Sequence, residues 1–233
     1  MPAAFVFPRV LDDLGWKDRL PSSAWREVTV PDARAVVGRY FTVMTKGHEY
    51  ERRVHSVENR AQPNRLTEFN WSAASQVHAD WRNVSPADRT SVLDRDLSAL
   101  AAIPEDVDVL DTARYDEHFA ELLDWLIGHR GIKVANATKL LYQKRPRLIP
   151  VMDEVARCVL GVAWTRGNRE CALDGLAAVR LAATHARNRD VVEDVFAWIA
   201  SGASPAGNLP VSRLRVIDIL AWSVGKAAGA GGR

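Results

Sequence analysis

The segment GIKVANATKLLYQKRPRLIPVMD, residues 131–153, combines a run of basic side chains with a single carboxylate at its end. Between positions 129 and 147 the chain has six lysines and arginines and no Asp or Glu. A basic run of this kind indicates a surface that binds a polyanion, such as a DNA or RNA backbone. The alternative interpretation is a solvated basic helix without a ligand.

A glycine turn precedes the basic run. It joins a helix expected from residue 116, which ends at Gly128 to Gly131, to a second helix expected over 132–142. The first backbone N–H groups of the second helix have no intrahelical partners, and the helix dipole adds positive partial charge there. Because Gly131 has no side chain, a phosphate could approach this backbone closely, flanked by Arg130 and Lys133.

Further basic residues extend the expected positive surface along the second helix and the loop after it. Tyr142 lies among them and is expected to stack on a base. The predicted nucleic-acid contacts are Gly128, His129, Arg130, Gly131, Lys139, Tyr142, Lys144, Arg145 and Arg147.

Asp153 follows the apolar residues Ile149 to Met152. A carboxylate in apolar surroundings suits a general base or an electrostatic stabiliser. The competing interpretation is that Asp153 caps the helix that begins after it, which is a common use of Asp. The two roles are compatible, because a capping carboxylate is held rigidly.

The elements that position these residues are expected to be helices. Helical patterns are expected over 30–44, 66–81, 85–104 and 116–131, in the run that Asp153 opens, and in three more runs after it. Pro31 and Asp32 mark an expected helix start, and Thr67 and Ser85 are the candidate N-terminal caps. The stretch 48–64 is polar and is left open as a short strand, a frayed helix or a loop. We therefore expect an all-α fold without a strand pair, with one domain over 1–227, lobes meeting near residue 110, and a disordered tail at 228–233.

Composition limits the function classes. The net charge is only +2, so the protein is not a general polycation. Cys158 and Cys171 have no metal-binding spacing, and no nucleotide-cofactor fingerprint is present, so we expect no metal and no cofactor. No apolar run is long enough for a membrane span, and we expect a cytoplasmic protein with no membrane partner. The sequence does not set the oligomeric state.

The glycine turn and Asp153 together resemble the helix–hairpin–helix DNA glycosylase superfamily. The hairpin runs from Ile127 to Ala135, and the turn Pro150, Val151, Met152, Asp153 matches that family's Pro-Val-x-Asp-like turn. His129 stands where the family has its first hairpin glycine. The stretches TKLL…KRPRLIPV and LRVIDILAW are also similar to an uncharacterised bacterial family that is distantly related to the glycosylases.

The resemblance implies a glycosylase-like helical fold and a DNA partner. It makes Asp153 the carboxylate for base excision, and it makes Lys133, two positions after the second hairpin glycine, the amine nucleophile of strand-cleaving members. Two alternatives stay open. One is a non-catalytic nucleic-acid-binding protein, and the other is a helical protein-interaction domain with no nucleic-acid role.

Overall fold

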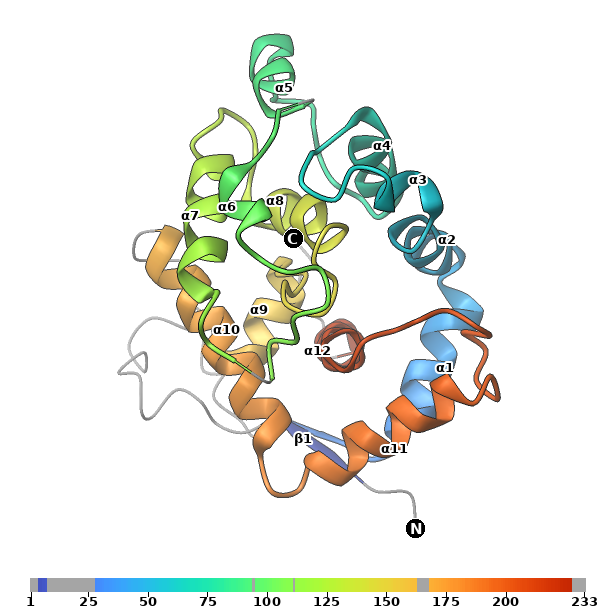
Figure 1. The fold of residues 1–233 in the computed structure, drawn as a ribbon. Coiled ribbons are helices and arrows are strands. Elements are labelled where there is room, and N and C mark those ends of the chain that lie inside the picture. Colours follow the sequence, from blue (N-terminus) through green and yellow to red (C-terminus); the bar gives the residue numbers. More distant parts are fainter. Residues whose placement is uncertain (1–3, 8–27, 94, 111, 163–167, 228–233) are drawn as a thin grey trace.

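The computed structural model describes residues 4–7, 28–93, 95–110, 112–162 and 168–227. Within these residues the fold is all-α, as expected, with twelve helices and a single small sheet (Figure 1). No helix in the described part of the chain has the length and apolar character needed to cross a membrane. The tail at 228–233 lies outside the described residues.

The helix bounds follow most of the predicted caps and stops. Side-chain oxygens of Asp32, Ser85 and Asp153 each accept a hydrogen bond from the backbone N–H three residues on, at 2.9 to 3.0 Å. The helices are α1 (Ala33–Val43), α2 (Thr45–Val54), α3 (Val57–Arg60), α4 (Glu68–Gln76), α5 (Pro86–Val92), α6 (Ser98–Ala101), α7 (Asp116–Ile127), α8 (Val134–Tyr142), α9 (Glu154–Leu160), α10 (Asn168–Thr184), α11 (Arg189–Ala200) and α12 (Arg213–Ala227).

Two predictions about elements need correction, and one open choice is decided. The polar stretch 48–64 is largely helical and contributes to α2 and α3, which is the helical alternative left open above. The helix expected over 85–104 is two short helices, α5 and α6, because the backbone turns extended at Leu93. Strands β1 (Phe5–Phe7) and β2 (Val28–Val30) pair antiparallel, although no strand pair was expected. Each has only three residues, too few for an alternating pattern to show.

Helix α12 lies in the middle of the helical array, where Figure 1 shows it end-on. It packs against α1, α9, α10 and α11, and α7 packs along α10. Nine residues of α12 are buried: seven are apolar or glycine, and the other two are the charged residues Arg215 and Asp218.

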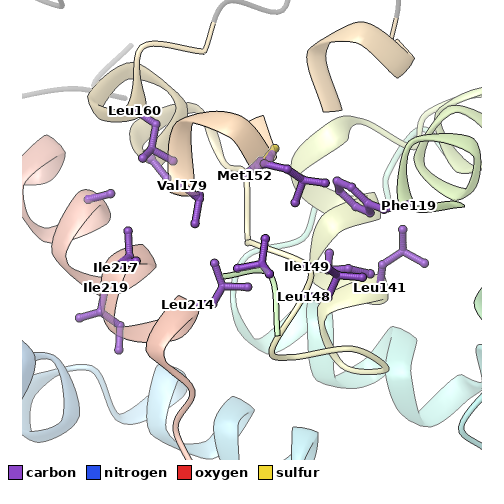
Figure 2. Packing of buried hydrophobic residues seen from close by; sticks show 14 of the residues in the cluster. Phe119, Leu141, Leu148, Ile149, Met152, Leu160, Val179, Leu214, Ile217 and Ile219 are labelled. Atoms are coloured by element: carbon purple, nitrogen blue, oxygen red, sulfur yellow. The ribbon is translucent and has the colours of Figure 1, made fainter. Parts of the chain in front are cut away.

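The loop between α8 and α9 carries part of the core. Leu148, Ile149 and Met152 are each fully buried, and Figure 2 shows them among core side chains that include Leu141 and Leu214. This apolar segment explains the approach to Asp153: it anchors the loop, so that α9 begins at a fixed place beside α8 and α12.

Candidate functional site

The turn between α7 and α8 has the expected glycine geometry but not the expected open space. Gly131 has φ = +88°, a left-handed conformation that glycine adopts without steric cost. A Cβ placed on Gly131 would lie 2.3 Å from the carbonyl oxygen of Asn83 and 2.8 Å from the backbone nitrogen of Val84. The space beside Gly131 that was expected to admit a phosphate is therefore filled by the protein's own backbone at Asn83 and Val84.

Two basic side chains of the turn remain on the surface. Arg130 and Lys133 are exposed, and Lys133 is the N-cap residue of α8. Gly128 is also exposed. His129 is half-buried, since its Nδ1 lies 3.0 Å from the carbonyl oxygen of Trp125 and its ring packs edge-on against that indole. The turn thus offers a polyanion two cations, Arg130 and Lys133.

The rest of the predicted basic surface is inside the protein. Lys139, Tyr142, Lys144 and Arg145 are all buried, which corrects the expectation of an exposed positive face. Arg147 is the exception: its side chain is 43% exposed, and its Nη2 lies 3.4 Å from Oδ2 of Asp108.

Arg145 shows why these charges turn inward. Its side chain is among the largest fully buried in the chain. Its guanidinium donates to the carbonyl oxygens of Leu100 at 2.6 Å, Ile103 at 2.7 Å and Pro63 at 3.0 Å. Five N–H donors in a fixed fork can satisfy several loop carbonyls at once. Arg145 therefore ties the chain after α3 and after α6 to the loop that follows α8.

Lys144 has a similar internal role. Its ammonium donates at 2.9 Å to Oδ1 of Asn59 and at 2.9 Å to the carbonyl oxygen of Gln62. Burial, together with the neighbouring charge of Arg145, lowers the pKa of Lys144 to about 8. With these contacts made, neither Lys144 nor Arg145 is available to bind a nucleic-acid backbone.

A pocket of about 350 Å³ opens where α1, α2, α8, α9 and α12 meet. Asp153 lines it from the start of α9, half-buried, with Oδ1 accepting the N–H of Ala156 at 2.9 Å. The capping role of Asp153 is therefore confirmed, and its carboxylate also borders a cavity. Ala135, in the first turn of α8, lines the same pocket.

Among the described residues that line this pocket, Lys139 is the buried amine. It lies one helical turn after Ala135 on the same face of α8, whereas Lys133 is exposed at the N-cap and is not among the described residues that line the pocket. The expected pairing of Lys133 with Asp153 is thus corrected. Lys133 precedes α8 as its N-cap residue and is exposed.

Lys139 is 7% exposed, and its Nζ donates to the carbonyl oxygen of Val77 at 2.8 Å. Burial lowers the pKa of Lys139, while the carboxylate of Asp153 acts in the opposite direction. A buried amine with a lowered pKa holds a larger neutral fraction, which is the nucleophilic form.

Asp218 borders the pocket from α12 and is 2% exposed. Its Oδ2 accepts the N–H of Val151 at 3.0 Å and lies 3.7 Å from Nη1 of Arg215, while Oδ1 has no hydrogen-bond partner among the described residues. Burial raises the pKa of Asp218 to about 7, partly opposed by the charge of Arg215.

The buried charges of Arg215 and Glu51, next to the pocket, are paired with each other. Arg215 donates from Nε to Oε1 of Glu51 at 2.7 Å and from Nη2 to the hydroxyl of Tyr40 at 2.8 Å. The hydroxyl of Tyr142 donates to Oε2 of Glu51 at 2.8 Å. Burial opposes the charge on Arg215, yet the carboxylate of Glu51 contributes to holding its pKa above the usual value.

Sequence reasoning missed Glu51 and Tyr40 as members of this site. Glu51 lies in a polar stretch whose neighbours gave no sign of burial. Asp218, which interrupts the apolar run VIDILAW, was the available signal, because an ionisable residue in an otherwise buried helix needs an internal partner.

Residues 33–225 match the model of a family described as "Family of unknown function (DUF6308)". The matched range includes Lys139, Asp153 and Asp218, and it covers most of the chain. No curated protein and no solved structure matches the sequence.

Proposed function

We propose that this chain, which belongs to the family of unknown function DUF6308, is a DNA-binding protein that takes an extruded nucleotide into the pocket bordered by Asp153. One observation carries the proposal. Helix α8 begins at a turn with exposed Arg130 and Lys133, and its next turns line the pocket through Ala135 and Lys139. A strand held at the turn would therefore lie close to the pocket.

The size of the pocket supports this proposal. At about 350 Å³ it is near the lower end of the range of small-molecule sites, which runs from about 300 to about 1,000 Å³. Such a volume suits one nucleotide but no stretch of duplex. A base in a duplex would have to leave the stack to enter, as it does in enzymes that act on bases.

The chemistry that Asp153 and Lys139 support is base excision. The neutral amine nitrogen of Lys139 would form a bond to C1′ as the bond from C1′ to the base nitrogen breaks. The electron pair leaves with the base, which takes up a proton from water, and Nζ passes a proton to Asp153. Before it takes this proton, the carboxylate also stabilises positive charge that develops on the sugar. The resulting N,O-acetal at C1′ opens to an iminium when the C1′–O4′ bond breaks and O4′ takes up the proton from Asp153.

A non-catalytic nucleotide-binding role is the second candidate. It is favoured by the hydrogen bond that Lys139 already makes to the carbonyl of Val77, which must break before the amine can attack. Binding of an extruded base needs no such change. The two functions share the turn and the pocket and differ only in whether a covalent step occurs.

DNA binding is tested by the salt dependence of affinity. The logarithm of the binding constant should fall linearly with the logarithm of salt concentration. Replacing Arg130 or Lys133 by Ala should reduce that slope by about 0.9 for each phosphate that the variant no longer neutralises. Arg187→Ala, an exposed site between α10 and α11, is the control and should leave the slope unchanged. A salt-independent affinity, or equal slopes in all four proteins, would overturn the proposal.

A further inference from the structure

The pocket has an exposed end and a buried end. Two exposed lysines line it, Lys46 from α2 and Lys226 from the end of α12. The buried carboxyl of Asp218 lines it from inside the fold, beside the buried cations Arg215 and Lys139, and Asp153 and Glu154 line it from the start of α9. The exposed lysines attract an anion, while the inner carboxyl offers an acceptor for a hydrogen-bond donor.

The inner end has an unused hydrogen-bonding atom. Oδ1 of Asp218 is buried and lacks a partner among the described residues, whereas Oδ2 is held by the N–H of Val151. Buried polar atoms in folded proteins are nearly always hydrogen-bonded, so an unpartnered oxygen on a side chain that lines a pocket is a candidate for contact with a ligand, an ion or water. Oδ1 has almost no accessible surface, so the Asp218 side chain must rotate to bring it into the pocket. In its ionised form the carboxyl accepts from an N–H or O–H donor.

The walls between these ends are aromatic and apolar. Tyr40 and Trp222 meet edge-on with ring centroids 6.1 Å apart, and both border the pocket together with Met44 and Ile219. Aromatic walls of this kind favour a flat ring, and base–aromatic stacking tolerates every nucleobase.

We propose that the pocket is a nucleotide site in which Asp218 accepts an N–H of the base while Lys46 and Lys226 hold the phosphate. This inference rests on the proposed function only in that a nucleotide occupies the pocket. It goes further by naming the residues that bind the base and those that bind the phosphate. It applies equally to a free nucleotide and to one in a strand, because the phosphate chemistry is shared.

The base contact is tested with two ligands that differ by one donor. Adenosine 5′-monophosphate has an exocyclic amino group, and purine riboside 5′-monophosphate has no N–H on its base. Binding is measured by calorimetry or tryptophan fluorescence at pH 8, where the carboxyl of Asp218, with a pKa of about 7, is ionised. It should be at least tenfold tighter for the adenine nucleotide. Equal affinity for the two nucleotides, or no binding of either, would overturn the assignment of Asp218. This comparison uses the unaltered protein and does not depend on the folding of a variant.

Variants then assign the two ends. Asp218→Asn should remove most of the difference between the two nucleotides, with a thermal melt to confirm folding. Lys46→Ala combined with Lys226→Ala changes only exposed side chains, and it should weaken the nucleotide at least fivefold while leaving adenosine unaffected. Equal weakening of nucleotide and nucleoside would contradict a phosphate role.

Two further arms separate this inference from DNA binding. Lys133→Ala should weaken DNA and leave the free nucleotide unchanged, since Lys133 lies outside the pocket. A single-stranded tetranucleotide of adenine should compete with the free nucleotide if the natural source is a strand. If the mononucleotide binds but the tetranucleotide does not displace it, the pocket assignment stands and the DNA proposal is overturned. Competition by the tetranucleotide supports both.

Discussion

The amine of Lys139 and the carboxylate of Asp153 border one pocket, although they belong to different helices. The loop between α8 and α9 creates this relationship. Its residues Leu148 and Ile149 are buried in the core, which fixes the start of α9 beside α8 (Figure 2). A carboxylate at a helix start and a buried amine are thereby held by packed elements on both sides.

The buried hydrogen bonds of Arg145 make it a stability determinant. Arg145→Ala would leave the carbonyls of Leu100 and Ile103 inside the protein without their donors. We expect the free energy of unfolding to fall by about 3 kcal/mol or more. Arg130→Ala, at an exposed position of the turn, should change it by less than about 0.5 kcal/mol. Urea denaturation of both variants checks this. Equal effects would show that Arg145 is not the internal tie described above.

Asp218 predicts a pH dependence of stability. Its pKa is raised to about 7 by burial, so the folded chain keeps a proton that the unfolded chain releases near pH 4. The charged groups around it are Arg215, Glu51 and Asp153, with the hydroxyl of Tyr40 nearby. The free energy of unfolding should therefore fall as pH rises from about 4 to about 7, by at most about 1.4 kcal/mol per pH unit, and then level off.

Asp218→Asn is the matched variant for this prediction, because it keeps the shape of the side chain and cannot ionise. Denaturation at pH 5 and pH 8 should give a smaller difference for the variant than for the unaltered protein. The prediction fails if the two proteins lose stability in parallel.

His78 lines the pocket and has φ = +63°, a left-handed conformation that costs a residue with a Cβ about 1 to 2 kcal/mol. Glycine relieves this strain but loses about 0.5 to 1 kcal/mol in chain entropy. His78→Gly should therefore leave the melting temperature unchanged or raise it by a few degrees, and it should weaken nucleotide binding. His78→Asn, which tolerates the same conformation, is the control. A clear fall in melting temperature for His78→Gly would mean that the imidazole stabilises the fold.

Much of the helical framework follows from local sequence. Asp32, Ser85 and Asp153 cap helices because a short oxygen-bearing side chain precedes each helix, and the glycine turn separates α7 from α8 as expected. The strands escape prediction because three residues are too few to show a period.

The inward direction of the basic residues could not be predicted in the same way. Lys144 and Arg145 donate to carbonyls between residues 59 and 103, which are distant in sequence and become neighbours only in the fold. Charge alone favours the surface, because Lys and Arg are rarely buried without partners. The one local indication is that α8 contains small residues such as Ala137 and Thr138. Small side chains let neighbouring elements pack closely on several faces of the helix.

The most direct test of the pocket is borohydride trapping on a duplex that contains an abasic site. The aldehyde carbon C1′ and an amine lose water to form an imine, and hydride reduces that imine to a stable covalent adduct. We predict an adduct with the unaltered protein and with Lys133→Ala, but none with Lys139→Ala and a slower one with Asp153→Asn. An adduct that survives Lys139→Ala but disappears in Lys133→Ala would contradict the pairing of Lys139 with Asp153. If the unaltered protein forms none while it still binds the duplex, the excision chemistry is wrong and the non-catalytic function holds.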